Sequence, residues 1–307
     1  MKRIVSYSGV ESGGLSLIIQ AEMILDVQAE LGEGAHWDSE ARRLYWVNIE
    51  GRQLRIVDPV TRSEQTHAFG QMISAAVPAV SGGWVVALQD GIYKFQEDQS
   101  LKLLAHVEKD LPGNRLNDAK CDSKGRLWFG TMSMEDKRDA GSLYVMEPGG
   151  EVRKVLSGIG ISNGLAWDDS RGLMYYIDTL TRGVDVMDYD LQNGTVSGRR
   201  TVVRFPEGAG GPDGMTIDSE GMIWVAHWNG GCVSRWNPHT GEQIGRVEVP
   251  APFVTSCAFG GGHLDELYIT SARSGMSPEE LQRWPLAGGL FRVNTGIRGV
   301  PANRFAG

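Results

Sequence analysis

The sequence predicts an all-β protein, a six-bladed β-propeller with four-stranded blades. Three observations predict it: a unit that recurs six times, an aromatic residue at the centre of each unit, and a high glycine content. Glycine makes up 41 of the 307 residues, which favours many turns between short strands. The central aromatic residues are Tyr45, Trp84, Trp128, Tyr175, Trp224 and Tyr268, separated by 39, 44, 47, 49 and 44 residues. A period of about 45 residues is typical of propeller blades.

Each unit begins with a polar residue and an apolar strand, turns at an Asp, and continues in a second β-rich run. Four copies are clear: GEGAHWDSEARRLYWVN (32–48), LNDAKCDSKGRLWFGT (116–131), SNGLAWDDSRGLMYYID (162–178) and PDGMTIDSEGMIWVAH (212–227). Two copies are weaker: ISAAVPAVSGGWVVAL (73–88) and TSCAFGGGHLDELYIT (255–270). A second pair of strands follows, with hairpin turns such as DPVTRSE, LQNGT and NPHTGE.

The units account for nearly the whole chain, so we expect a single propeller domain over residues 25–307. Residues 1–24 are expected to be an N-terminal leader or first strand. The alternative is two separate β domains, but the repeat runs through the midpoint without a break. A closed ring also removes exposed sheet edges. Helical periodicity is weak, apart from a short turn at SPEELQRW (277–284).

Charge and cysteine usage exclude several classes of partner and site. Thirty Lys and Arg against 38 Asp and Glu give a net charge of −8, which disfavours nucleic acid and anionic membranes as partners. Cys121, Cys232 and Cys257 lie far apart without a CxxC pair, so we expect buried thiols rather than disulfides or a cysteine zinc site. The N-terminal apolar run (15–19) is too short for a signal peptide. We expect a cytoplasmic monomer, with a dimer as the alternative.

Equivalent positions in the repeat point to a site. The innermost strand of each blade lines the channel, so residues at its start converge on one axis. The position four residues before the apolar residue that precedes the Asp turn holds Glu33, Asn117, Asn163 and Asp213. The weaker copies carry Ile73 and Thr255 there.

Two carboxylates and two carboxamides at matching positions favour a hard divalent cation. Oxygen ligands of this kind suit Ca²⁺ best, with Mg²⁺ or Mn²⁺ as alternatives. Zn²⁺ is less expected, because it usually takes nitrogen and sulfur ligands. The competing interpretation is that these Asn and Asp residues only cap turns. That accounts for any one of them and poorly for four at matching positions.

The motifs resemble the regucalcin (senescence marker protein)/gluconolactonase family. The matching stretches are LGEGAHW, NRLNDAKCDSKGRLWFGTM, ISNGLAWDDSRGLMYYID, PDGMTIDSEGMIWVAHWNGG, TSCAFGG and PLAGGLFRV. The resemblance implies a six-bladed propeller with a divalent metal at one end of its channel. The metal ligands it implies are Glu33, Asn163 and Asp213, and it gives Asp213 the role of general acid/base.

The same resemblance assigns substrate contacts. The family's substrate-contacting arginine falls on Arg115, a neighbouring contact on Asn117, and a loop glutamate on Glu135. Two positions depart from the family pattern: Ala35 stands where Pro is usual, and Asn48 where Asp is common. Neither is an implied ligand, so we expect the chemistry to survive. His227 is expected to be structural, with a role at the rim or as a base as the alternative.

These residues suit a metal-dependent lactonase that opens a sugar lactone, such as gluconolactone, to its aldonic acid. A cation would polarise the carbonyl and acidify water, and Asp213 would accept the water's proton. Two alternatives remain open from sequence. One is an organophosphate-type phosphotriesterase that uses the same metal, and the other is a calcium-binding regulatory protein without turnover. No GxSxG nucleophile elbow is present.

Overall fold

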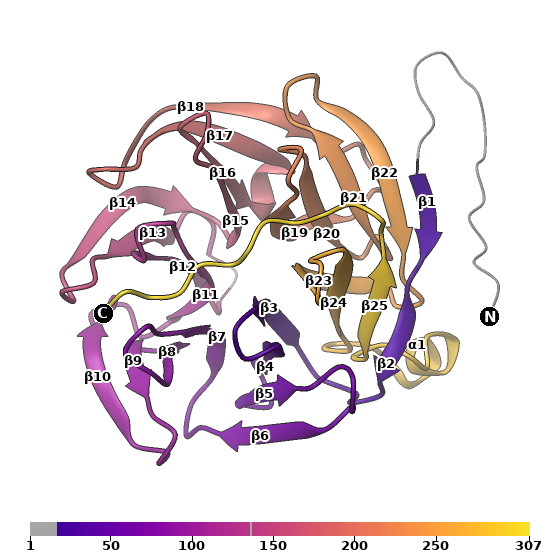
Figure 1. The fold of residues 1–307 in the computed structure, drawn as a ribbon, viewed down its shortest axis with the longest axis horizontal. Coiled ribbons are helices and arrows are strands. Elements are labelled where there is room, and N and C mark those ends of the chain that lie inside the picture. Colours follow the sequence, from indigo (N-terminus) through magenta and orange to yellow (C-terminus); the bar gives the residue numbers. More distant parts are fainter. Residues whose placement is uncertain (1–16, 136) are drawn as a thin grey trace.

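The computed structural model describes residues 17–135 and 137–307, and it arranges six antiparallel sheets around one axis (Figure 1). This confirms the predicted six-bladed β-propeller with four-stranded blades. The first three blades are blade 1, β3 (Gly32–Asp38), β4 (Arg43–Asn48), β5 (Gln53–Val57) and β6 (Glu64–Ala68); blade 2, β7 (Ile73–Pro78), β8 (Trp84–Leu88), β9 (Gly91–Phe95) and β10 (Leu101–His106); blade 3, β11 (Asn114–Cys121), β12 (Leu127–Ser133), β13 (Gly141–Met146) and β14 (Val152–Ile159).

The remaining blades follow the same order from the channel outwards, with one exception in the last. They are blade 4, β15 (Ser162–Asp168), β16 (Leu173–Asp178), β17 (Gly183–Asp190) and β18 (Thr195–Arg204); blade 5, β19 (Gly211–Ile217), β20 (Ile223–Trp228), β21 (Cys232–Asn237) and β22 (Glu242–Glu248); blade 6, β23 (Phe253–Gly260), β24 (Glu266–Ala272), β25 (Leu290–Asn294) and β2 (Glu22–Leu25). A 3₁₀ turn, η1 (Thr179–Thr181), follows β16, and the helix α1 (Pro278–Arg283) lies between β24 and β25.

The ring closes by pairing two ends of the chain. The outermost strand of blade 6 is β2, which precedes blade 1 in sequence and pairs antiparallel with β25. Just before it, β1 (Leu17–Gln20) pairs parallel with β22 and adds a fifth strand to blade 5. Closure in this way covers the β25 edge, which would otherwise expose unpaired backbone groups. Residues 1–16 of the expected leader lie outside the described residues.

Apolar side chains fill the space between neighbouring blades. Among the described residues they form six clusters, each made by two adjacent blades. Five of the six central aromatic residues expected from the repeat are buried there, and Trp84 is partly buried. The three cysteines are buried and unpaired, as expected. No described helix is long and apolar enough to cross a membrane.

Each inner strand carries a β-bulge where the site residues lie. The register against the next strand shifts between these pairs: Glu33/His36 in β3, Leu116/Ala119 in β11, Ser162/Leu165 in β15 and Pro212/Met215 in β19. A bulge inserts an unpaired residue and re-aims its side chain. The residues from the repeat therefore sit at or inside the bulges near the start of each inner strand.

Glycines next to the bulges let the inner strands pack closely. A Cβ built on Gly164 would stand 2.8 Å from the carbonyl oxygen of Asp213. A Cβ on Gly214 would stand 2.7 Å from Ser256 Oγ and 2.8 Å from the carbonyl oxygen of Thr255. All three distances are shorter than real Cβ contacts. Only glycine therefore permits β15, β19 and β23 to approach in this way around the channel.

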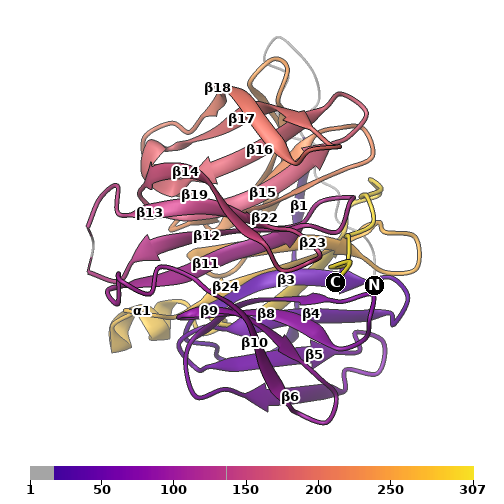
Figure 2. The same ribbon diagram turned by 90° about the vertical axis from the view of Figure 1, so that its left-hand side faces the viewer.

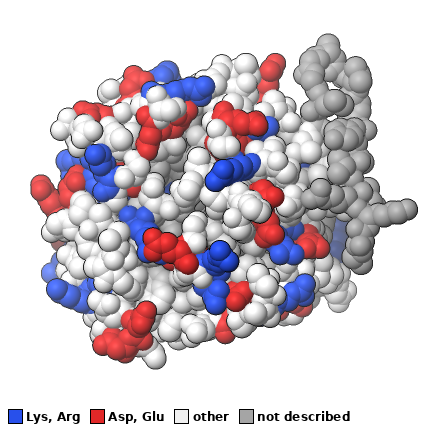
Figure 3. Space-filling view, viewed as in Figure 1, with Lys and Arg blue, Asp and Glu red and all other residues white. Residues whose placement is uncertain are grey.

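The C-terminal segment crosses one face of the ring (Figure 1). We call residues 299–305 the strap. Gly299 bridges to Asp218 in blade 5, and Phe305 bridges to Ala79 in blade 2. Figure 2 places the C-terminus and α1 on opposite faces of the ring. Figure 3 shows Lys, Arg, Asp and Glu interspersed over the described part of the strap face, without an extended basic patch.

Candidate functional site

The predicted site residues meet at the channel end away from the strap. Glu33 enters from β3, Asn117 from β11, Asn163 from β15 and Asp213 from β19, and each is buried with 4–7% of its surface exposed. This end is on the α1 face, because the backbone of Glu30, just before β3, accepts hydrogen bonds from Arg273 and Ser274. The structure thus brings together four residues that lie up to 180 positions apart, from Glu33 to Asp213.

Glu33 and Asp213 form a buried carboxyl pair. The two carboxyls lie close enough for each to act on the pKa of the other, and Glu33 Oε2 accepts a 2.9 Å hydrogen bond from the backbone N–H of Gly34. Burial and the neighbouring negative charge of Asp118 raise the pKa of Glu33 to about 8. Burial, followed by the charge of Glu33, raises the pKa of Asp213 well above its usual value. For Glu33 the positive charge of Arg115 opposes the rise, but burial and the neighbouring negative charge outweigh it.

The residues present fit a bound divalent cation. Asp213 Oδ1 is buried and has no hydrogen-bond partner among the described residues. A buried carboxylate oxygen without a partner is costly unless an ion or a proton satisfies it. The described residues contain no group of three or more His, Cys, Asp or Glu side chains placed to hold a metal. A third protein ligand would therefore be a neutral oxygen, and the side-chain oxygen of Asn163 is one that could serve.

A chain of hydrogen bonds orients the two amides. Asn117 Nδ2 donates to the backbone oxygen of Ser162 (2.7 Å) and to Asn163 Oδ1 (3.2 Å). Asn163 Nδ2 donates to Thr179 Oγ1 (2.8 Å), which donates in turn to the backbone oxygen of Pro212 (2.7 Å). Because Pro212 directly precedes Asp213, this chain ties β11, β15 and β19 together. It also fixes the side-chain oxygen of Asn163 as the end that can face a cation.

Arg115 lies beside the carboxyl pair. Its Nη1 donates to Asn117 Oδ1 (2.7 Å) and to the backbone oxygen of Leu116 (2.9 Å). Both N–H groups of Nη1 are then used, while Nε and Nη2 have no partner among the described residues. Burial lowers the pKa of Arg115, and the negative charges of Glu33 and Asp213 oppose that shift. Arg115 therefore presents a positive, partly unused fork close to both carboxyls.

Two charged residues were missed in the sequence analysis, the buried Asp118 and the partly buried Lys120. Asp118 lies next to Asn117 in the bulge of β11, and its negative charge acts on both Glu33 and Asp213. Burial raises the pKa of Asp118, and the positive charge of Lys120 opposes that shift. The signal in the sequence was the run NDAK (117–120). In it, Asp118 directly follows the expected site residue Asn117, and Lys120 comes two residues after Asp118.

Glu135 stands apart from this network. It follows β12, its side chain is 57% exposed, and it pairs with Lys137 at 2.6 Å. It lies beside the start of β11, because a Cβ on Gly113 would stand 3.1 Å from Glu135 Oε1. The structure therefore places Glu135 on a surface loop near the strand that carries Arg115. No hydrogen bond joins it to the described carboxyl pair.

His227, Asn48 and the two weaker repeat positions have structural partners. Both ring nitrogens of the buried His227 are engaged, with the backbone oxygen of Ala209 (2.7 Å) and with Ser234 Oγ (2.5 Å). Asn48 Oδ1 accepts from the backbone N–H of Leu31 (3.1 Å), just before β3. Thr255 Oγ1 donates to the backbone oxygen of Gly32 (2.5 Å). Ile73 is fully buried in an apolar cluster.

The fold and site define a class: six-bladed propellers with a carboxylate pair and amides at one channel mouth. The family model described as SMP-30/Gluconolactonase/LRE-like region matches residues 31–273 of the chain. The chain belongs to this family, which confirms the resemblance found in the sequence.

Individual relatives agree. Regucalcin of Oryctolagus cuniculus is 38% identical over 296 residues, which cover 94% of this chain and 99% of that protein. A Bacillus subtilis (strain 168) protein named "Putative sugar lactone lactonase YvrE" is 41% identical over 290 residues, again with 94% and 99% coverage. The crystal structure of a calcium-binding protein, regucalcin of Agrobacterium tumefaciens str. C58, matches with a TM-score of 0.89 and 29% identity, covering 94% and 98% of the two chains.

Proposed function

We propose that this protein is a divalent-metal-dependent lactonase that hydrolyses a sugar lactone to its aldonic acid. The observation that carries the proposal is the buried pair of Glu33 and Asp213, in which Asp213 Oδ1 has no partner among the described residues, together with Arg115, whose charge acts on both carboxyls. Family membership and the relative named as a sugar lactone lactonase support it. We assign Glu33, Asn163 and Asp213 as the groups that would hold the cation, with Ca²⁺ most expected from their oxygen ligands.

When bound, a divalent cation supplies a Lewis acid for the lactone carbonyl. The chain's own residues do the rest. Asp213, in its ionised form, accepts the proton of the attacking water. Water oxygen bonds to the carbonyl carbon, the bond from that carbon to the ring oxygen breaks, and the ring oxygen takes the proton from Asp213. The products are one carboxylic acid and one new hydroxyl group.

Arg115 and Asn117 are proposed to orient the substrate. Asn117 holds Nη1 of Arg115, so that Nε and Nη2 present a fixed donor pair. A sugar lactone carries several hydroxyl oxygens that such a fork can bind. Glu135, on its exposed loop, is proposed to contact the distal end of the substrate. Its pairing with Lys137 would have to yield for that contact to form.

The test is acid release from a panel of aldonolactones near neutral pH. Protein stripped of metal receives Ca²⁺, Mg²⁺, Mn²⁺ or Zn²⁺ singly, and spontaneous hydrolysis is subtracted. We expect one or two ions to restore turnover, and Asp213→Asn to lower it by at least about a hundredfold. Glu97→Gln, which removes an exposed carboxylate in the β9–β10 turn, is the matched control. Wild-type turnover in Asp213→Asn would refute the assignment.

The second candidate is a calcium-binding protein without turnover, favoured by the relatives named regucalcin. The same protein samples separate the two. Calcium binding that depends on Glu33 and Asp213, with no acid release from any lactone under any ion, would support this candidate. An arginine with unused donors beside the carboxyl pair favours the lactonase, because a calcium site has no use for a cation there.

A further inference from the structure

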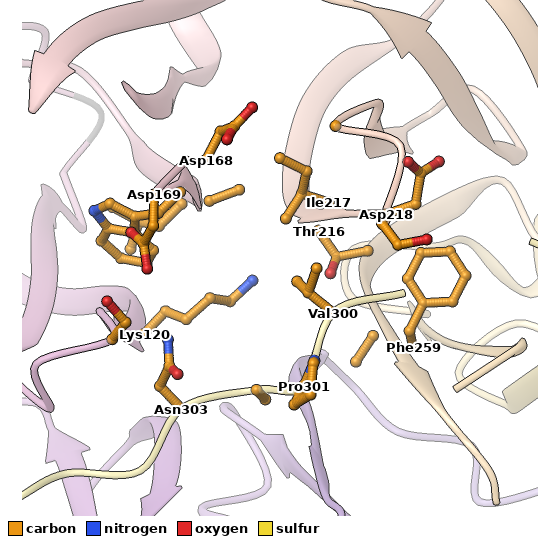
Figure 4. A pocket seen from close by; sticks show the side chains of 18 of the residues that line it. Lys120, Asp168, Asp169, Thr216, Ile217, Asp218, Phe259, Val300, Pro301 and Asn303 are labelled. Atoms are coloured by element: carbon orange, nitrogen blue, oxygen red, sulfur yellow. The ribbon is translucent and has the colours of Figure 1, made fainter. Parts of the chain in front are cut away.

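A cavity of about 460 Å³ lies at the strap end of the channel, away from the carboxyl pair (Figure 4). Its walls are the ends of the inner strands and the turns that follow them in blades 4 and 5, and the strap closes one side. This volume is in the range of small-molecule sites in proteins. None of the residues assigned above to the cation or the substrate lines it.

The strap side of the cavity is preformed. Asn303 Nδ2 donates to the backbone oxygen of Cys121 (3.3 Å), and the backbone N–H of Phe305 donates to Pro78 (2.9 Å). Arg304 donates to both carboxylate oxygens of Asp38, at 2.6 and 2.8 Å. These bonds fix the strap to blades 1, 2 and 3. A ligand would therefore enter a shaped space and would not need to order the strap first.

Lys120 supplies a positive charge at the inner end. Its side chain runs from β11 into the cavity, as Figure 4 shows. Nζ donates to the backbone oxygen of Met215 at 2.6 Å. An ammonium group has three donors, and the structure gives this one a single hydrogen-bond acceptor among the described residues. Burial lowers the pKa of Lys120, and the negative charge of Asp118, two residues earlier on the same strand, opposes that shift.

The carboxylates that line the cavity are mostly compensated. Asp168 pairs with Arg171 at 3.1 Å. Arg235 pairs with both Asp218 (2.8 Å) and Glu220 (2.5 Å). Asp169, at the exposed mouth, has no ion-pair partner among the described residues. The positive charge that an incoming ligand meets inside the cavity is therefore that of Lys120.

The other lining groups suit a hydroxylated ligand. Hydroxyls and one carboxamide face the cavity beside an apolar wall of Val300, Pro301 and Phe259; the polar groups are Ser123, Thr216, Ser219 and Asn303. We propose that this cavity is a second ligand site for a small hydroxylated carboxylate of the sugar-acid class, with Lys120 binding the carboxylate. Sugar acids are also the product class of the proposed reaction. Only the choice of a sugar acid as the probe rests on the proposed lactonase function. The evidence for the site comes from the residues that line the cavity.

The test is calorimetric titration of the full-length, metal-free protein with sodium gluconate, and with sorbitol as the uncharged analogue. Lys120→Met removes the charge, and Val300→Trp fills the mouth from a strap side chain that is 40% exposed. Lys124→Met, an exposed lysine in the next turn, is the matched control. We expect gluconate to bind, sorbitol to bind far more weakly, and both cavity variants to lose at least about tenfold in affinity. Lys124→Met should match wild type.

Three outcomes would overturn the proposal: no gluconate binding up to about 10 mM, equal binding of sorbitol, or unchanged gluconate affinity in both cavity variants. The last would mean that gluconate binds elsewhere, for example at Arg115. If Lys120→Met fails to fold by circular dichroism, Val300→Trp decides. The titration measures binding and needs no turnover. A failure to bind gluconate would therefore not contradict the lactonase proposal, and a lack of lactonase activity would not contradict gluconate binding in this cavity.

Discussion

In the metal-free protein, the buried carboxyls of Glu33 and Asp213 lower the stability of the fold. Both are buried close to each other, and their pKa values are raised because burial and neighbouring negative charges disfavour their ionised forms. A fold that keeps such a pair without a function would gain from replacing either member. Because they lie at equivalent bulges of β3 and β19, both side chains are directed towards the channel axis.

Glu33→Gln is expected to remove the stabilisation that a divalent cation gives. A ligand at a hundred times its Kd raises the free energy of unfolding by about 2.7 kcal/mol, so wild type should melt several degrees higher with saturating Ca²⁺. The variant should melt at the same temperature with and without the ion. Thermal denaturation followed by circular dichroism measures this, with Glu97→Gln as control. An undiminished shift in Glu33→Gln would exclude it as a ligand.

Arg115→Lys is expected to lower kcat/KM for a sugar lactone by at least about tenfold. Lysine keeps the charge but loses the planar fork that Asn117 holds through Nη1. The cation-induced rise in melting temperature should persist, which separates lost substrate contacts from a collapsed site. Arg52→Lys changes an exposed arginine that donates to Gly70 and should behave as wild type. Unaltered kcat/KM in Arg115→Lys would remove it from the substrate site.

His227 is expected to make the protein less stable as the pH falls. Burial lowers its pKa to about 4, against about 6.5 when unfolded. Between these values the unfolded chain binds more protons, so the stabilisation is complete above about pH 6.5 and is lost towards pH 4. The loss amounts to about 3 kcal/mol at most.

His227→Gln should flatten this dependence when the free energy of unfolding is measured from pH 7 to pH 4. Part of the slope should remain, because burial also lowers the pKa of His36 to about 4. The exposed His263→Gln serves as the comparison. If wild type and His227→Gln lost stability in parallel across this range, the buried imidazole would not be the cause.

At the scale of the element, the inner strands explain what sequence could and could not predict. The repeat predicted six strands and the four polar positions near their starts, because a period of about 45 residues fixes equivalent places in a ring. Asp118 and Lys120 were missed because a bulge turns successive side chains out of simple alternation. The strap lies outside the repeat, so the periodicity of the sequence could predict neither the strap nor the cavity beside it. The role of Glu135 stays a prediction.

Gly214→Ala tests the close approach of β19 and β23. The new methyl would meet Ser256 Oγ at 2.7 Å and the backbone oxygen of Thr255 at 2.8 Å. We expect a loss of about 1–3 kcal/mol in the free energy of unfolding and weaker cation binding, because Asp213 would be displaced. Gly149→Ala, where a Cβ meets nothing within 4 Å, is the control. Equal stability of the two variants would show that the strands can yield.

At the scale of the whole molecule, two segments near the N-terminus have different roles in the ring. β1 adds a strand outside an already complete blade, whereas β2 completes blade 6. The packing of Ile24 in the cluster between blades 6 and 1 ties β2 to the core as well. Closure of the ring should therefore depend on β2 and much less on β1.

Two deletions test this difference. Removal of residues 1–20 takes away β1 and should leave a folded protein with a modestly lower melting temperature. Removal of residues 1–25 also takes away β2, exposes the β25 edge, and should cause aggregation or loss of cooperative melting. Size-exclusion chromatography and thermal denaturation report both outcomes. Comparable behaviour of the two truncated proteins would mean that β2 does not close the ring.

The pairing of β2 with β25 also has a consequence for biosynthesis. β2 leaves the ribosome some 270 residues before its partner β25 and must wait for that strand. Until then the nascent chain holds an open arc of blades with two unsatisfied ends, and such edges invite contact with other chains. Joining segments some 270 residues apart is slow because the loop must close first. The protein should therefore depend on chaperones most in the interval before β25 pairs with β2.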